Sequence, residues 1–100
     1  MKEYDLYVPL VSNHGRPLPP ARLQLLKKQL VKKFGGLTHF PQKNRGLWKV
    51  GAVTFVDAIV ILRVLSPGDD RSFWKKLKSQ LQREWDQKDV LIVARNVTVL

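Results

Sequence analysis

The longest apolar run in the chain constrains its fold more than any other feature. It extends from Thr54 to Leu65, contains neither Gly nor Pro and is rich in β-branched residues, a composition typical of a central β-strand. From Val56 to Val64 its even-numbered positions are all apolar, so this face is expected to lie under helices. Its odd-numbered positions mix apolar side chains with Asp57 and Arg63, a face that is neither ordinary core nor free surface.

Amphipathic patterns predict one helix on each side of this strand. The first is expected from about Pro20 to Phe34, with Gly35 as the left-handed residue that ends it. The second is expected from about Asp70 to Gln87, where the side chain of Asp69 or Asp70 would cap the first free N–H groups. Apolar residues recur at three- and four-residue spacing in both, at Leu23, Leu26, Leu30 and Phe34 and at Phe73, Leu77, Leu81 and Trp85.

Shorter segments complete the sheet. Residues 4–11 alternate like a first strand, and residues 37–40 are expected to form a short second strand. Residues 41–46 are expected to be a loop, because Pro, Asn and Gly favour turns. Residues 47–50 would resume the strand beyond it. Residues 89–100 are again β-branched and are expected to close the chain as the last strand.

The predicted order of elements is β-α-β-β-α-β, the ferredoxin-like arrangement. We therefore expect an α+β fold, one domain over residues 1–100, with a four-stranded antiparallel sheet of order 4-1-3-2. Right-handed crossovers would place both helices on one face. The centre of the core is expected to contain Leu26, Leu30, Val60, Leu62, Leu77 and Leu81.

The chain is strongly basic, with a formal net charge of +10 and a pI near 10.3. Such a surface suggests polyanionic partners, nucleic acid among them. Cysteine is absent, which excludes disulfides and thiolate metal sites and is compatible with a cytoplasmic protein. We expect no signal peptide and no membrane partner, because the start lacks an apolar core and no apolar run reaches about 18 residues. We expect no cofactor, because the sequence has no phosphate-binding loop and no His-Glu-x-x-His motif.

Several short motifs resemble a family of small uncharacterised bacterial proteins with a ferredoxin-like fold. They are Asn13-x-Gly15-x-Pro17, Phe34-Gly-Gly-Leu-Thr38, Gly46-Leu-Trp48 and Val90-Leu-Ile-Val-x-Arg95. Together they extend over nearly the whole chain. The resemblance implies the fold and no particular activity.

A second resemblance covers ten residues. Glu84-Trp-x-Gln-x-x-Val-Leu-Ile-Val93 is similar to the closing helix and strand of phage lyases that cleave S-adenosylmethionine, which have a related trimeric fold. The likeness implies a small-ligand or lyase-like enzyme with its site between subunits. No catalytic residue of that family can be placed on this chain.

Polar residues of the central strand are the first candidates for a ligand site or an interface. Asp57 and Arg63 lie on the same strand face, about 20 Å apart, and cannot pair with each other. Arg63 could pair with Asp5 of the first strand, whereas Asp57 lacks a partner for acid catalysis and is better explained as an ion-pair or interface residue. The other candidates for ligand or interface contacts are His39, Tyr7 and Trp48. His14 and His39 alone make a poor metal site.

Basic residues supply the candidates for nucleic-acid binding. Around residues 41–49 they lie close in sequence to Phe40 and Trp48. Basic residues combined with aromatic side chains are typical of proteins that bind single-stranded nucleic acid. On the two helices they could hold a phosphate backbone without reading sequence. The candidates are Lys27, Lys28, Lys32, Lys43, Arg45, Lys75 and Lys76.

One sheet face would remain open in this fold, and it is predicted to be largely apolar. Its side chains are Tyr7, Pro9, Val11, Phe55, Ile59, Ile61, Leu91, Val93, Val97 and Val99. A patch of this size predicts a homodimer or homotrimer, unless the segment around Trp48 folds back over the face. We therefore expect a small basic oligomeric module without catalytic activity, with nucleic-acid binding and a small-ligand or lyase-like enzyme as the alternatives.

Overall fold

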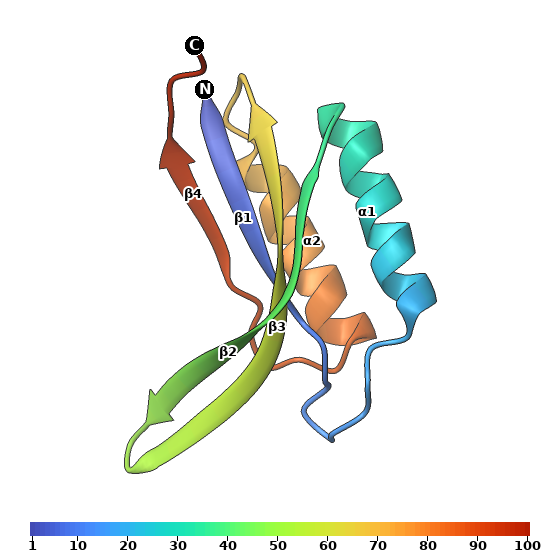
Figure 1. Cartoon of the computed structure of the whole chain (residues 1–100), viewed down its shortest axis with the longest axis vertical. Coiled ribbons are helices and arrows are strands. Elements are labelled where there is room, and N and C mark those ends of the chain that lie inside the picture. Colours follow the sequence, from blue (N-terminus) through green and yellow to red (C-terminus); the bar gives the residue numbers. More distant parts are fainter.

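The computed structural model describes all residues, 1–100, and has the predicted order of elements. The strands are β1 (Lys2–Pro9), β2 (Thr38–Val50), β3 (Val53–Ser66) and β4 (Ile92–Asn96). The helices are α1 (Pro20–Phe34) and α2 (Arg71–Glu84). The sheet is antiparallel with order β2-β3-β1-β4, and both helices cover one face of it (Figure 1). The α+β ferredoxin-like prediction is confirmed.

The core lies between the helices and the even-numbered side chains of the central strands. All six residues predicted for its centre are buried, and Leu6, Leu30, Leu62 and Leu77 are among the most deeply buried. Aromatic side chains close the end of the core near the start of α2, where Trp74 stacks on Phe34 with ring centroids 5.4 Å apart. The helix of residues 20–34 has the predicted bounds, and Gly35 ends it with φ 83°.

The segment predicted as a loop, residues 41–46, is part of a continuous β2. Phe40 pairs with Ile61 and Asn44 pairs with Ile59, so a bulge absorbs the intervening residues. Pro41 is tolerated because β2 is an edge strand, where a missing N–H leaves no ladder bond unmade. The loop prediction was therefore wrong, because the turn-forming residues of this segment lie in and beside a bulge.

The bounds of the outer strands also differ from the prediction. β1 begins at Lys2 and ends at Pro9, so Val11 lies beyond the sheet ladder. β4 begins at Ile92 and ends at Asn96, so Leu91, Val97 and Val99 are not strand residues. With Val11, the open face consequently loses four of its ten predicted apolar side chains.

The β2–β3 hairpin extends well beyond the rest of the sheet as a two-stranded arm, residues 45–58 (Figure 1). β1 pairs with β3 from Ile59 to Ser66, and the N–H of Leu10 donates to the carbonyl of Ala58, so from Val53 to Asp57 β3 has a single neighbour. Gly51 turns the tip with φ 62°, as the first central residue of a type II′ hairpin requires. The arm projects and does not fold back (Figure 1), so the alternative in which the segment around Trp48 covers the open face is wrong.

Candidate functional site

A charged cluster occupies the open face of the sheet, formed by Glu3, Asp5, Arg63 and Arg95. The register brings it together, because Asp5 lies opposite Arg63 on β3 and Glu3 lies opposite Arg95 on β4. Arg63 donates from Nε and Nη2 to the two carboxylate oxygens of Asp5, at 2.8 and 3.0 Å. Arg95 donates from Nη1 to Asp5 Oδ2 at 2.9 Å. The predicted Asp5–Arg63 pair is therefore present, within a larger network.

Glu3 completes the network. Its Oε1 lies 2.9 Å from Arg63 Nε, and its Oε2 accepts a hydrogen bond of 3.2 Å from Arg95. Sequence reasoning missed Glu3, although it shares the strand face of Asp5 two residues away. The alternation Glu3-x-Asp5 opposite two arginines is the signal that could have revealed it.

Interactions within the cluster stabilise the charged forms of Asp5, Arg63 and Arg95. The hydrogen bonds from Arg63 lower the pKa of Asp5 and outweigh the burial that would raise it, and Arg95 adds to the effect. The hydrogen bond to Asp5 likewise raises the pKa of Arg63 and that of Arg95. A carboxylate held in this way does not take up or release protons near neutral pH, so the cluster is suited to fixing structure and presenting guanidinium donors.

An aromatic ring extends the cluster toward β2. The guanidinium carbon of Arg63 lies 5.0 Å from the ring centroid of Phe40, a cation–π contact. Tyr7 is half-buried on the same sheet face, opposite Ile61. Arg63 is thus held by carboxylates on one side and by an aromatic face on the other.

Asp57 and Trp48 lie apart from this cluster, on the arm. Asp57 pairs across the hairpin with Gly46 and makes no salt bridge, and Trp48 lies opposite Phe55. The structure brings no acid or base to Asp57, so it adds nothing in favour of a catalytic role.

His39 lies on the other face of the sheet, away from the open face that carries Asp57 and Arg63. It pairs across β3 with Leu62, which faces the helices, and its Nδ1 is 3.3 Å from Nζ of Lys27 on α1. Its Nε2 is buried without a partner. Burial, and then the charge of Lys27, lower the pKa of His39. The pairing of His39 with Leu62 sets this face.

Metal-binding groups are not clustered anywhere in the chain. No three His, Cys, Asp or Glu side chains lie together as ligands would. His14 contacts Asp86 in the loops at the far end of the helices and does not meet His39. No helix is long and apolar enough to span a membrane.

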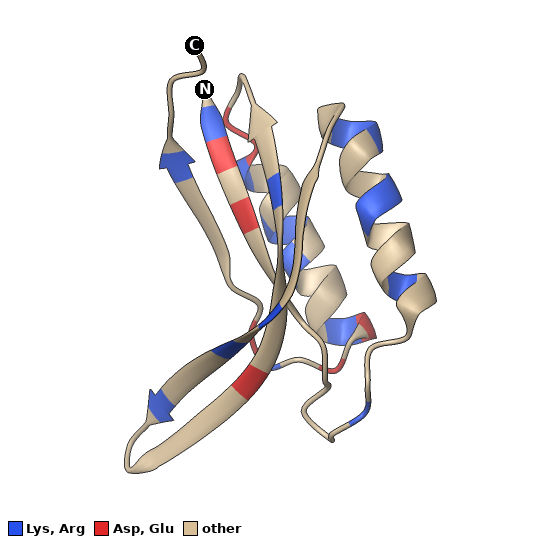
Figure 2. Cartoon of the chain, viewed as in Figure 1, with Lys and Arg blue, Asp and Glu red and all other residues tan.

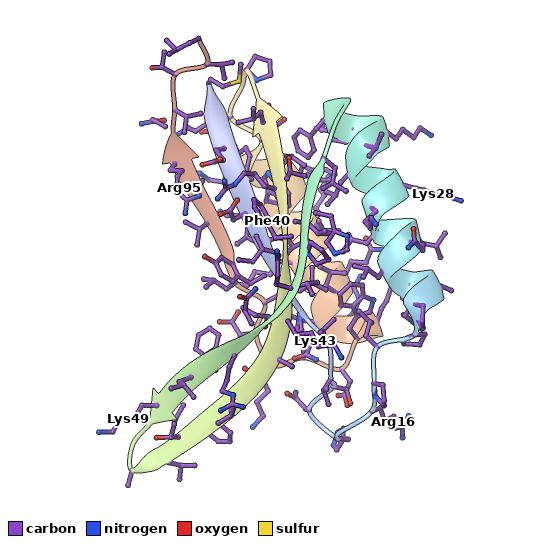
Figure 3. All side chains as sticks on the ribbon, viewed as in Figure 1. Arg16, Lys28, Phe40, Lys43, Lys49 and Arg95 are labelled. Atoms are coloured by element: carbon purple, nitrogen blue, oxygen red, sulfur yellow. The ribbon has the colours of Figure 1, made fainter.

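The basic candidates for nucleic-acid contact divide between two regions (Figure 2). Lys28, Lys32, Lys75 and Lys76 are exposed on the helices, whereas Lys27 is half-buried against His39. Lys43 and Arg45 are exposed on β2, in the bulge and at the base of the arm. Figure 3 shows Lys28 and Lys49 extending away from the ribbon, one on α1 and one near the arm tip. The structure does not join these bases into one surface.

Comparison with known proteins identifies the fold. No family model matches the chain, and no curated protein sequence matches it. Among solved structures, the chain is similar to the crystal structure of a CutA1 variant from Pyrococcus horikoshii OT3, with a TM-score of 0.61 and 13% sequence identity. The match covers 100% of this chain and 86% of that chain. At this identity the likeness shows a shared ferredoxin-like fold.

Proposed function

We propose that this protein is a non-catalytic module that assembles with further copies of itself, as a dimer or trimer, through the arm and the open sheet face. The observation that carries the proposal is the apolar surface of the arm. Its large exposed side chains are Leu47, Trp48, Val50, Val53, Phe55 and Val56.

These side chains occupy both faces of the arm. Leu47 pairs with Val56 on one face and Trp48 with Phe55 on the other. The helices end short of the arm (Figure 1), so no segment of the chain covers either face. Apolar patches of this kind mark interaction surfaces in proteins that are otherwise compact. Burying even 500 Å² of it would contribute on the order of 12 kcal/mol before association costs.

The backbone of the arm supports the same proposal. From Val53 to Asp57, β3 has a ladder partner on one side only, and β2 is an edge strand along its full length. Unpaired strand edges readily accept a further strand. A second copy can therefore add main-chain hydrogen bonds to the apolar contacts.

The charges favour a second copy of this chain as the partner. Asp57 has no ion partner within its own chain, while Arg63 and Arg95 keep side chains 36% and 41% exposed with further N–H groups free to donate. All three lie on the open face, with the acid on the arm and the bases on the body of the sheet. An arm laid on a neighbouring sheet would bring unlike charges together, which favours correct pairing over other contacts.

Light scattering of the purified chain tests the assembly. At micromolar concentration the mass should be two or three times 11.5 kDa. Ile59→Lys, at the base of the arm, and Phe55→Lys, on the arm itself, should return the mass to that of one chain. The control is Leu25→Lys, which changes an exposed leucine of α1 and should leave the mass unchanged.

Three results would contradict the proposal. One is a wild-type mass of 11.5 kDa at every concentration. Another is an equal effect of Leu25→Lys, which would place the interface on the helices. A single-chain mass together with Trp48-dependent binding to anionic lipid vesicles would assign the arm to a membrane surface.

Nucleic-acid binding is the second candidate function, favoured by the helix lysines. Lys28, Lys32, Lys75 and Lys76 are exposed and make no ion pair, as a surface that binds phosphates requires. Binding to DNA or RNA should weaken steeply between low and physiological salt. Reversing these four charges should abolish it, whereas changing Trp48 should affect single strands alone. Binding that does not change with salt concentration, or the absence of binding at low salt, would contradict this candidate.

A further inference from the structure

We infer that a groove beside the start of α2 is a binding site for a small phosphate monoester. The groove has a volume of about 210 Å³ and lies between α2 and the β1–β4 side of the sheet. Its lining comprises Lys2, Tyr4, Asp69, Arg71, Trp74, Lys75, Lys78, Ile92 and Ala94. This site goes beyond the proposed self-association and does not depend on it.

The charge of the lining is strongly positive. Four of its residues are basic and one, Asp69, is acidic. Lys78 is engaged by Asp89 at 2.9 Å, and Arg71 is 3.9 Å from Asp69. Lys2 and Lys75 have no ion partner. These two unpaired bases converge from β1 and from α2, and together they attract an anion into the groove.

The floor of the groove is apolar and rigid. Tyr4 and Trp74 are 3% and 5% exposed, with ring centroids 5.0 Å apart. The hydroxyl of Tyr4 accepts a hydrogen bond of 3.0 Å from the backbone N–H of Asp70, which ties the floor to the start of α2. Ile92 and Ala94 of β4 complete the lining. An apolar ligand body would contact these side chains.

Charge and size together select the ligand class. A phosphate monoester is close to a dianion at neutral pH and offers three strong acceptor oxygens. Several basic side chains can therefore bind it better than they would bind a single carboxylate. The volume is below that of sites for drug-sized ligands, so the ester group must be compact. The groove lies near the chain termini, at the end of the molecule opposite the arm tip (Figure 1).

Phenyl phosphate is the probe for the test, titrated at low salt into the ¹⁵N-labelled full chain and followed by NMR. The chain has three indole N–H signals, from Trp48, Trp74 and Trp85. The signal of Trp74, whose Nε1 is buried without an acceptor, should move most as the groove fills. Inorganic phosphate should bind more weakly than phenyl phosphate, and phenol should not bind, because the site needs both the charge and the apolar body.

A matched pair of lysine variants separates this site from general attraction to a basic chain. Lys75→Ala removes a lining residue, and Lys76→Ala removes its exposed neighbour outside the groove. We expect the dissociation constant of phenyl phosphate to rise by about fivefold in the first variant and by less than about twofold in the second.

Three results would overturn the inference. Equal weakening by Lys75→Ala and Lys76→Ala, or shifts spread over both helices without a response from Trp74, would indicate diffuse attraction only. Inorganic phosphate binding as tightly as phenyl phosphate would remove the role of the apolar floor and with it the assignment to a monoester.

Discussion

The body of the sheet and the arm share the strands β2 and β3, yet side chains on one face of β3 are buried in the body and exposed in the arm. On β3, Val64 is 2% exposed and Val56 is 60% exposed, although both are valines on the same strand face. The difference is that α1 and α2 lie over the first and do not reach the second (Figure 1). Alternation along a strand therefore fixes which side chains share a face, whereas burial depends on what lies over that face.

The largest expected effect tests the body of the sheet. Leu30→Ala or Leu77→Ala should lower the free energy of unfolding by about 2–5 kcal/mol, because each leaves a cavity in a filled core. Urea denaturation measures the change. A loss below about 1 kcal/mol at both positions would mean that these leucines are not the centre of the core.

The charged cluster should have the next largest effect. Arg63→Met removes two hydrogen bonds from the buried carboxylate of Asp5 and should cost roughly 1–3 kcal/mol of unfolding free energy. Arg71→Met, at an arginine of α2 whose side chain is 75% exposed, is the control and should cost less than about 0.5 kcal/mol. Equal effects would show that the cluster contributes nothing particular to stability.

The dependence of the unfolding free energy on acid pH tests the contribution of Asp5 to the charged cluster. The pKa of Asp5 is lower in the folded chain than in the unfolded chain, so the stabilisation is present above the ordinary aspartate pKa of about 3.9 and is lost as pH falls below it. Asp5→Asn should flatten this loss when unfolding is measured between pH 7 and pH 2. An unchanged acid dependence would assign it to other carboxylates.

A smaller effect is expected at His39. Lys27→Met removes one of the two causes that lower the pKa of His39, so the pKa should rise, as followed by NMR titration of the ring. Lys28→Met, one residue along α1 and exposed, should leave that pKa unchanged. Because the folded pKa is lowered, His39 opposes folding as pH drops through about 6.5. Equal responses in both variants would place Lys27 away from the ring.

The smallest effect on stability is expected from the arm. Leu47 is 67% exposed, so Leu47→Ala should change the unfolding free energy by less than about 0.5 kcal/mol when the chain is too dilute to associate. At concentrations that favour assembly the same variant should lose more, because the side chain is then covered. An identical loss at both concentrations would argue against the arm as an interface.

Most of the fold could be predicted because it depends on local patterns. Three- and four-residue spacing of leucines predicts both helices, and Gly35 marks the end of α1 because an L side chain is strained at its positive φ. The alternation of β3 predicts which of its residues face the helices. Even the pairing of Asp5 with Arg63 follows, since both lie on the open faces of neighbouring strands.

Only the tertiary structure decided how far the strands extend and which residues meet. The bulge that keeps residues 41–46 in β2 depends on pairing with β3, and no local signal distinguishes it from a loop. The register of β4 brings Arg95 to Glu3 and Asp5, and the position of α1 gives His39 its contact with Lys27. The groove beside α2 likewise brings together Lys2 and Lys75, which are far apart in the sequence. Sequence determines the elements and their faces, because these follow from local geometry. Neighbours across the sheet are set by packing, which a single strand does not encode.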